Sequence, residues 1–428
     1  MLLVWLISVS VVVGERAQDT CIFASCNRQN LPQDYWRLLG SFERAKTFLW
    51  TGDAVYAKSN SVSALEDAYS SLKGNSHYRE FVRDRSVYGV WDDHDYGVND
   101  GGNLVPDRKQ RKELYLEFIN STSSADQNRE GLYKTFTIGS APVEVRFILL
   151  DTRYHRDSHW VRSVGEFPIP FSALMAAFVR LAYITLGLGR DHTGDVLGTP
   201  QWEWLVNVLS NSKSDFHVIV SSTQIFTTNP IVESWGHFPE AKRRLVDLLI
   251  EADPSGLVFI SGDVHLAELS RAVVTRKDGR QFLWTEVTSS GLTHTCADSM
   301  VTSAICPAMM QAFTQHREDA DDFYIGTNFG VIRTFTSSNC TTDLNLTLAA
   351  QAEECSSSQD ARMEVAVYSL SDVPPRPVLT HTVYSSNLDS QVLNEIVSVE
   401  YFNFPYLQEK VAIDVIICAI ALLFCVVW

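Results

Sequence analysis

Short apolar runs that end at polar residues recur along the chain. They are rich in Val, Ile, Phe and Leu and are bounded by Asp, Gly or His, which is typical of buried β-strands. The predicted strands span residues 47–51, 86–91, 143–150, 216–221 and 257–261. Helical patterns lie between them, as at residues 201–209 and 241–250. Strands that alternate with helices predict an α/β sheet, in which ligands collect at the carboxyl ends of the strands.

The two ends of the chain are apolar. Residues 2–13 have the length of a signal-peptide core, so we expect a signal peptide at residues 1–18, with a buried strand or helix as the alternative. Residues 411–428 predict a transmembrane anchor, with a lipid-anchor signal as its rival. Between them we expect one globular domain at residues 19–384 and a stalk at 385–410. This organisation predicts a single-pass membrane protein of the secretory pathway, with its globular domain luminal or extracellular.

A third apolar segment is an insert at about residues 165–190, with Arg180 in its middle. A membrane crossing there would separate the acidic residues Asp53 and Asp93 from Asp263, which we expect to lie together. We therefore predict a buried or lid-like amphipathic helix, and a contact with a membrane surface is the alternative.

The balance of charges limits the partners. The 51 acidic residues outnumber the 35 Lys and Arg residues, so the net charge is −16 at pH 7. Nucleic-acid binding is not expected, because phosphate backbones are held by basic surfaces. An acidic protein that handles phosphate esters would need metal ions to offset the repulsion. The sequence does not indicate an oligomeric state.

Cysteine spacing and sequons suit an oxidising compartment. Cys296 and Cys306 are close enough in sequence to form a local disulfide, as are Cys340 and Cys355. Sequons for N-glycosylation occur at Asn120, Asn339 and Asn345. These features predict a disulfide-bonded glycoprotein.

The first candidate metal ligands follow the strand at residues 47–51. Asp53 comes after Gly52 and can bridge two cations, and a Tyr56 phenolate can bind a hard trivalent ion. By itself this motif is weak, because a Gly-Asp pair at a strand end is more often a cap or a turn.

The next strand ends in a denser acidic group. Asp92, Asp93 and Asp95 surround His94, and no Lys or Arg stands among them. These carboxylates would repel one another unless cations were bound. His94 is then placed to protonate a leaving alkoxide or to orient a phosphate.

The strand at residues 257–261 is followed by Asp263 and His265. Side chains at positions i and i+2 after a strand point the same way, so these two could share a metal ion. Taken alone, this pair is as compatible with a structural role as with metal binding.

Further motifs in compatible order extend the pattern over most of residues 20–370. They are Phe23-Ala24-Ser25-Cys26, GDAVY at 52–56, WDDHDYGVND at 91–100, LLDTRYHR at 149–156, LGTPQWEWL at 197–205, SSTQIF at 221–226, SGDVHLAE at 261–268 and VTSSGLTH at 287–294. Together they resemble the PhoD-like alkaline phosphatases and phosphodiesterases of the metallophosphoesterase superfamily.

This resemblance implies a four-layer αββα sandwich and a cluster of Fe(III) and Ca(II), although the same residue types also suit other metals. The implied iron ligands are Cys26, Asp53, Tyr56 and Asp263. The implied calcium ligands are Asp53 as a bridge, Asp93, Asn99, Asp263 and His265. Arg153 would orient phosphate. Cys26 would be a ligand rather than the partner of Cys21 in a disulfide, which is the alternative.

We therefore expect a metal-dependent hydrolase of phosphoric monoesters, diesters or both. A metal-activated hydroxide would attack phosphorus in line, and His94 or His265 would assist the leaving group. The alternatives are a membrane-anchored diesterase of the phospholipase type and a non-catalytic cell-surface protein that retains the fold.

Overall fold

The structure, a computed structural model, describes residues 16–140, 143–299, 302–336, 361–385, 396–400 and 404. Within these residues the strands form two mixed β-sheets. The first has the order β13-β12-β11-β1-β2-β3, and its β1, β2 and β3 run parallel. Its strands are β1 (Arg16–Ala24), β2 (Ala45–Thr51), β3 (Ser86–Val90), β11 (Asn328–Thr336), β12 (Ala361–Ser369) and β13 (Pro377–Tyr384).

The second sheet has the order β10-β8-β9-β7-β6-β5-β4, and β14 also pairs with β8. Its central strands β5, β6, β7 and β9 run parallel. Its strands are β4 (Lys134–Ile138), β5 (Val145–Leu149), β6 (Phe216–Val220), β7 (Leu257–Ser261), β8 (Ala267–Arg276), β9 (Gln281–Ser289), β10 (Phe323–Tyr324) and β14 (Ile396–Glu400).

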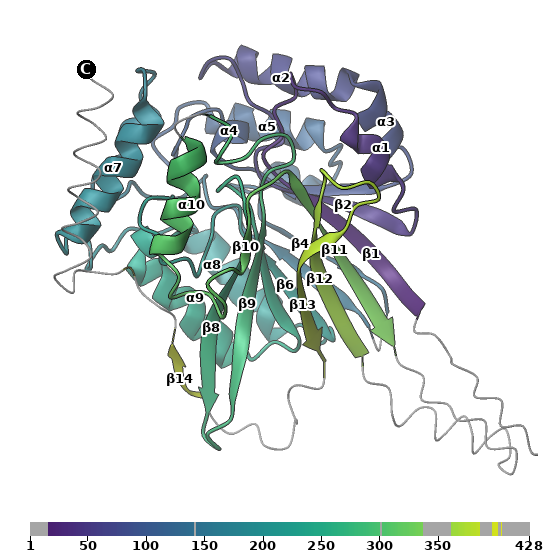
Figure 1. The fold of residues 1–428 in the computed structure, drawn as a ribbon, viewed down its shortest axis with the longest axis vertical. Helices are drawn as coiled ribbons and strands as arrows, with labels where there is room; N and C mark the ends of the chain where they lie inside the picture. The colour runs from purple at the N-terminus through teal and green to yellow at the C-terminus, as the bar shows by residue number, and fades with distance from the viewer. Residues whose placement is uncertain are drawn as a thin grey trace, which may run out of the picture.

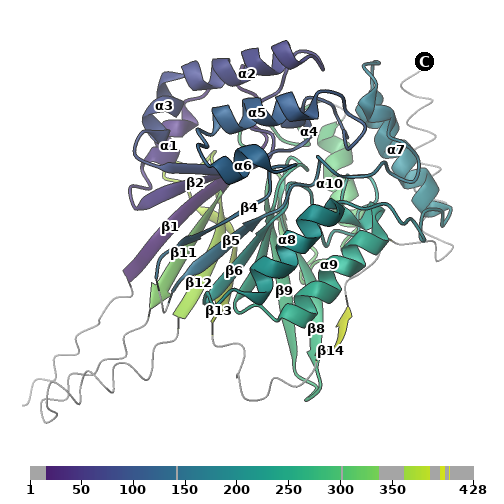
Figure 2. The ribbon, with the colours of Figure 1, turned by 180° about the vertical axis from the view of Figure 1, so that it is seen from behind.

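Helices cover the outer face of each sheet, as Figure 1 and Figure 2 show from opposite sides. The helices of the first half are α1 (Tyr35–Gly40), α2 (Val62–Gly74), α3 (Ser76–Val82), α4 (Asp93–Tyr96), α5 (Arg108–Phe118) and α6 (Ser124–Asn128). The later ones are α7 (Ser172–Thr185), α8 (Gly198–Ser210), α9 (Pro239–Ala252) and α10 (Thr302–Ala312), with single 3-10 turns η1 (Val164–Glu166) and η2 (Trp235–His237).

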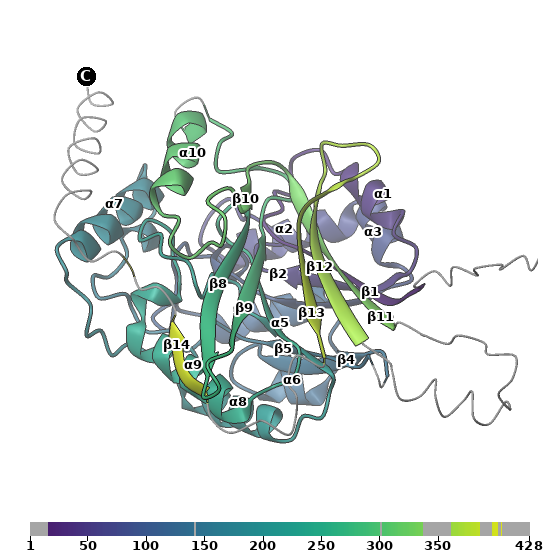
Figure 3. The ribbon, with the colours of Figure 1, turned by 60° about the horizontal axis from the view of Figure 1, so that its bottom comes forward.

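Three hydrophobic cores separate these layers. The first core packs α1, α2, α3 and α5 against the first sheet, with the Trp36 and Trp50 rings at its centre. The second core lies between the sheets, where Phe23 and Leu49 share a cluster with Val218. Figure 3 shows β12 and β13 beside β8 and β9. The third core packs α8 and α9 on the second sheet. The order of layers is thus helix, sheet, sheet, helix, as predicted.

The predicted elements are present. The five apolar runs correspond to β2, β3, β5, β6 and β7, and the two helical patterns correspond to α8 and α9. Their burial explains the sequence pattern, because every residue of β6 and β7 is buried. Strands covered on both faces read as continuous apolar runs rather than alternating ones.

The predicted localisation has to be corrected. Among the described residues no helix is long and apolar enough to cross a membrane. The apolar insert forms α7, whose 14 residues would span only about 21 Å at 1.5 Å per residue, short of the hydrocarbon thickness of about 30 Å. A single-pass membrane protein is therefore not supported. The expected anchor at 411–428 lies outside the described residues.

The other predictions for the chain ends meet the structure only in part. Residues 1–15 of the expected signal peptide lie outside the described residues, and 16–18 belong to β1. Within the expected stalk, β14 pairs with β8, and Phe404 is buried against Tyr183 and Ile184. Residues 396–400 and Phe404 therefore lie against the domain.

Candidate metal centre

The candidate ligands meet at one edge of both sheets. Cys26 follows β1, Asp53 follows β2, Asp93 follows β3, and Asp263 follows β7. Each of these strands runs parallel to a neighbour, so their carboxyl ends share an edge where side chains from distant segments converge. The sequence prediction of a site at these strand ends is thus matched by the topology.

Two glycines allow the strand ends to approach closely. A Cβ atom at Gly52 would lie 2.7 Å from Asp92 Cβ, and one at Gly262 would lie 2.6 Å from Ser25 Oγ and from the Thr51 carbonyl oxygen. Real Cβ atoms do not come so near other heavy atoms. The two sheets therefore meet here because these positions have no side chain.

The first ligand group contains Cys26, Asp53 and His265, whose ligand atoms all lie within 4.8 Å of one another. Cys26 Sγ is 3.8 Å from Asp53 Oδ2 and from the Asp263 carbonyl oxygen. The Tyr56 hydroxyl is 2.9 Å from Asp53 Oδ2 and 3.1 Å from His265 Nε2. Thiol, carboxylate, phenol and imidazole thus converge on one point.

The second ligand group contains Asp53, Asp93 and His94, again with ligand atoms within 4.8 Å. The His94 ring stacks on Tyr56 at 4.0 Å between centroids, and its Nε2 lies 3.9 Å from Asp93 Oδ1. Its side chain is 32% exposed, whereas that of Asp93 is 6% exposed. His94 therefore stands at the open side of the centre.

A third group brings Asp263 next to Asp92 and Asp93 within the same 4.8 Å limit. Asp53 belongs to the first two groups and Asp93 to the second and third, so two carboxylates connect all three. Such shared carboxylates are what a cluster of neighbouring cations requires.

Several of these residues hold their backbone in the left-handed region. The φ angles are 61° at Cys26, 51° at Asp53, 71° at Asp263 and 58° at His265. Non-glycine residues adopt such angles rarely and at a cost, and they do so mainly at functional sites. The loop backbone therefore fixes the positions of these candidate ligands.

Burial and mutual repulsion disfavour the charges of this cluster. Burial, with repulsion from Asp92 and Asp93, raises the pKa of Asp53 and of Asp263 well above the usual range. Burial also raises the pKa of the Cys26 thiol. Cations at the centre would reverse these shifts, because they stabilise carboxylate and thiolate.

Unpaired buried oxygens support the same conclusion. Among the described residues, Asp92 Oδ2 and Asp93 Oδ1 are buried and have no hydrogen-bond partner. A buried oxygen without a donor is costly unless something else satisfies it. Burial lowers the pKa of His265 to about 3, so its imidazole is neutral, as a metal ligand must be. The donor set and the unpaired oxygens fit bound metal ions.

Arg153 lies behind the cluster. Its guanidinium is fully buried, with Nε donating to Asp92 Oδ1 at 2.6 Å and Nη1 donating to Glu233 Oε2 at 2.8 Å. Arg156 adds a second contact to Glu233 at 3.1 Å. This arrangement fixes the Asp92 carboxylate, so the geometry favours a positioning role, and the expected contact of Arg153 with phosphate stays a prediction.

Asn99 and its neighbour Asp100 lie where the insert approaches the site. A Cβ atom at Gly165 would lie 2.4 Å from Asn99 Nδ2, so the Asn99 amide faces the start of the insert. The Asp100 backbone N–H donates to Asp93 Oδ2 at 2.9 Å, and Arg180 of α7 donates to Asp100 Oδ2 at 2.8 Å. The insert thus contacts the acidic cluster through Arg180, and calcium binding by Asn99 stays a prediction.

Sequence reasoning missed Glu233, Asp100 and Arg180 as members of the site. Asp100 and Glu233 form a further carboxylate group with Asp93. Glu233 follows no apolar strand, and its partner Arg153 is 80 residues away, so only the folded chain brings them together. The one available signal is an acidic residue within the apolar stretch Pro230-Ile231-Val232-Glu233.

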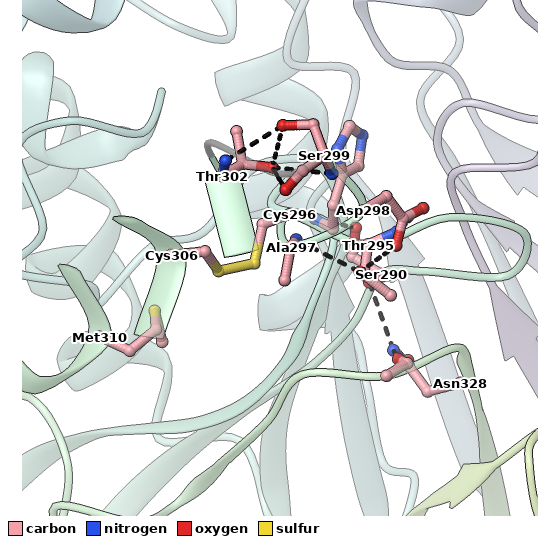
Figure 4. Close-up of a disulfide and its surroundings, with 12 residues drawn as sticks. Ser290, Thr295, Cys296, Ala297, Asp298, Ser299, Thr302, Cys306, Met310 and Asn328 are labelled. Atoms are coloured by element: carbon pink, nitrogen blue, oxygen red, sulfur yellow. Dashed lines mark hydrogen bonds between the residues drawn. A yellow bond between two sulfur atoms is a disulfide. The ribbon is translucent and has the colours of Figure 1, made fainter. Parts of the chain in front are cut away.

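A loop held by a disulfide contacts the centre, and Figure 4 shows this disulfide with Ser290 and its other neighbours. Ser290 Oγ accepts from the His265 backbone N–H at 2.8 Å and lies 3.0 Å from Cys26 Sγ. Cys296 donates its N–H to the His265 carbonyl at 2.9 Å and forms the predicted disulfide with Cys306 of α10. Cys26 has no disulfide, which removes the alternative of a bridge to Cys21.

His294 in the same loop was also not assigned from sequence. Its ring lies 4.2 Å from the His265 ring and 5.2 Å from the Tyr56 ring, between centroids. It is 4% exposed, and in the part of the chain that the structure describes its Nε2 has no hydrogen-bond partner. His294 thus adds an imidazole to the edge of the cluster, with Nδ1 bonded to Thr293 Oγ1 at 3.1 Å. The predicted bridge between Cys340 and Cys355 lies outside the described residues, as do two of the three sequons.

Known proteins resemble this chain in sequence and in fold. A family model described as PhoD-like phosphatase matches residues 21–344. Alkaline phosphatase D from Bacillus subtilis (strain 168) is 26% identical over 231 residues, which is 47% of this chain and 36% of that protein. The chain therefore spans about a third of the length of this curated relative.

One solved structure shares the fold. The structure of PhoD superposes with a TM-score of 0.54 at 15% sequence identity, covering 85% of this chain and 72% of that chain. At this identity the likeness concerns the fold alone. It agrees with the two sheets and their outer helices.

Proposed function

Because the chain belongs to the PhoD-like phosphatase family, as its motifs predicted, we propose that it is a metal-dependent hydrolase of phosphoric monoesters, diesters or both. One observation carries this proposal. Buried carboxylates from three strand ends lie in ligand groups with a thiol and two imidazoles, and the Tyr56 phenol contacts Asp53. Two of these buried carboxylate oxygens have no hydrogen-bond partner among the described residues. Such a set is unfavourable without cations and well suited to several of them.

The donor types suggest how the ions would be divided. Cys26, Asp53, Tyr56 and Asp263 would hold a hard trivalent ion such as Fe(III). Calcium ions would take oxygen-rich positions from Asp53, Asp93, Asn99 and Asp263, with His265 completing them. Bound ions would supply the activation of water for attack on phosphorus and the neutralisation of charge on the phosphoryl oxygens. Other divalent metals would suit the same residues.

His94 is the residue proposed to move a proton. Its ring stands at the open side of the centre, held by stacking on Tyr56 and by its backbone N–H, which donates to Asp53 Oδ1 at 3.2 Å. Burial lowers the pKa of His94, and the Asp93 carboxylate opposes that shift. In its protonated form the imidazole can pass the Nε2 proton to a leaving alkoxide oxygen. Arg153 acts through Asp92 by fixing that carboxylate.

The proposal is tested by metal content and activity together. The purified chain should contain metal on elemental analysis and should hydrolyse p-nitrophenyl phosphate, bis(p-nitrophenyl) phosphate or both. Chelation should abolish turnover, and added ions should restore it. A metal-free chain, or one whose hydrolysis survives complete metal removal, would contradict the proposal.

The role of His94 has its own test. Because p-nitrophenolate leaves without a proton, the variant His94→Asn should lose little rate with nitrophenyl esters and at least tenfold with alkyl esters. Equal losses on both kinds of ester would show that His94 does not protonate the leaving group. His155→Asn is the matched control, because that side chain follows Arg153 outside the ligand groups.

A further inference from the structure

The insert carries an unusual outer surface. Of the sixteen large hydrophobic side chains that are well exposed among the described residues, ten lie between residues 160 and 188. We call these ten the α7 face, and their exposure runs from 36% at Val161 to 75% at Phe171. Its members are Trp160, Val161, Phe167, Ile169, Phe171, Leu174, Met175, Phe178, Leu186 and Leu188. A concentration of exposed apolar side chains in one segment is typical of an interaction site.

The polarity of α7 is inverted relative to a helix on a water-soluble surface. Arg180 is only 8% exposed and points inward, donating to Asp100 and, from Nε, to the Ile231 carbonyl at 2.9 Å. Tyr183 is also buried, 2.7 Å from His237 Nδ1. The polar side chains Arg180 and Tyr183 thus face the protein, where Leu181 and Ile184 are also buried. Leu174, Met175 and Phe178 are exposed on the outside. Such an arrangement is favourable where the outer medium is apolar.

The start of the helix makes the same point. Phe171 is the N-cap residue, its φ is 61°, and its side chain is 75% exposed. A bulky residue in the left-handed region is uncommon and costs free energy. In water this residue would gain nothing from its exposure, whereas transfer of the ring into an apolar phase would offset that cost.

The charges around the α7 face indicate which kind of partner surface it fits. Arg180 is the one charged residue of α7. At the border Arg162 bonds to Glu166 at 2.7 Å and lies over the Phe167 ring, and Arg190 and Asp191 follow the last apolar residue. The charges of these four border residues sum to zero, whereas the whole chain has a net charge of −16 at pH 7. A neutral patch on an acidic protein matches a zwitterionic lipid surface, which does not repel it, better than an anionic one.

The α7 face is also placed beside the metal centre. Arg180 connects α7 to Asp100, and Asp100 belongs to a ligand group with Asp93. Figure 1 and Figure 2 show α7 at the periphery of the molecule, near the edge of the sheets at which the ligands meet. A surface that seats the α7 face would lie beside the candidate active site.

We propose that the α7 face docks on a zwitterionic lipid surface and presents the metal centre to phosphate esters carried by that surface. The docking step stands on the α7 face itself, and the choice of substrate rests on the proposed function. Shape complementarity is not needed for a lipid surface, which suits a face built from flexible Leu, Met and Phe side chains.

The test uses the full chain and phosphatidylcholine vesicles. The unmodified protein should float with the vesicles, and the double variant Phe171→Asn, Leu174→Gln should bind them at least tenfold more weakly. Asn tolerates the left-handed backbone and Gln favours helix, so both changes are compatible with the local fold. The matched control is Val206→Gln, Val397→Gln, because these side chains are 45% and 62% exposed outside the α7 face. The control should bind as the unmodified protein does.

Hydrolysis separates docking from chemistry. Both variants should keep the rate on soluble bis(p-nitrophenyl) phosphate, and only the α7 variant should lose at least tenfold on a phosphodiester embedded in vesicles. If no ester is hydrolysed by any of the proteins, the proposed function fails while the vesicle result still decides docking. If the double variant does not fold, Leu186→Gln, which lies after the helix, should weaken binding at least threefold.

Four outcomes would overturn the inference. The first is that the unmodified protein does not float with the vesicles. The second is that the α7 variant floats equally well, because another part of the chain would then bind lipid. A dimer in lipid-free solution that dissociates in the α7 variant would instead assign the α7 face to a second copy of the chain. Stronger flotation with anionic than with zwitterionic vesicles would contradict the charge argument.

Discussion

Replacing Asp53 by Asn should weaken ion binding and should also stabilise the metal-free protein. Asp53 belongs to two ligand groups, so its loss should empty or weaken more than one ion position. Without ions the same substitution should raise the free energy of unfolding. The reason is that burial and four neighbouring carboxylates disfavour the charge of Asp53 and raise its pKa well above its usual range. The Asn side chain has the same size and removes that repulsion.

The magnitudes follow from the ligand count and the size of the chain. Ions present at about 100 times their dissociation constant add about 2.7 kcal/mol to the free energy of unfolding. For a chain of 428 residues the entropy of unfolding is about 0.9 kcal/mol/K, so this corresponds to a Tm change of about 3 °C. Loss of a shared ligand should lower kcat/KM at least about a thousandfold, which is about 4 kcal/mol in the barrier.

The assay compares Tm and turnover of wild type and Asp53→Asn, each with ions and with chelator. Wild type should lose about 3 °C on chelation, and the variant should lose little and melt above the chelated wild type. The control is Asp34→Asn, whose carboxylate is 77% exposed and should affect neither quantity. Activity above a tenth of wild type in Asp53→Asn, or equal chelator shifts in both proteins, would refute the reasoning.

Two further predictions concern the parts that support the centre. Burial lowers the pKa of His237 to about 3 in the folded protein, whereas in the unfolded chain it is about 6.5. Because the unfolded state therefore takes up a proton first, the free energy of unfolding is highest above about pH 6.5 and falls as the pH drops toward 3. Between pH 7 and pH 5 the free energy of unfolding, measured in urea titrations, should fall about 2 kcal/mol more for wild type than for His237→Gln. An equal fall in both proteins would contradict this. The free energy of unfolding of the double variant Cys296→Ser, Cys306→Ser should be about 2–3 kcal/mol lower than that of wild type, because the variant lacks a disulfide that closes a loop of sequence separation 10. Reductant should destabilise wild type by about this amount more than it destabilises the variant. A reductant effect of the same size on both proteins would disprove the assignment.

The parts of the fold predicted from sequence are those whose cause is local. The apolar runs that form β6 and β7 are buried on both faces, so the apolar character of each residue follows from its own burial. Asp53, Asp93 and Asp263 were found for a related reason, since each comes directly after such a run. The parallel direction of the strands then brings these residues to one edge.

The parts that were missed depend on contacts between distant segments. Glu233 meets Arg153 and Arg180 meets Asp100 across 80 residues each, and neither pair has a local pattern. The polarity of α7 was also beyond the sequence. Its apolar residues predict a helix, but which side faces outward depends on Asp100, to which Arg180 turns.

The left-handed backbone at Cys26, Asp53, Asp263 and His265 limits which side chains can replace these residues. Asn and Gly adopt this conformation at low cost, whereas long or β-branched residues do not. Exchange of Asp for Asn therefore changes the local charge by one unit and leaves the loop intact. The charge of the centre can thus be changed one residue at a time on the same backbone.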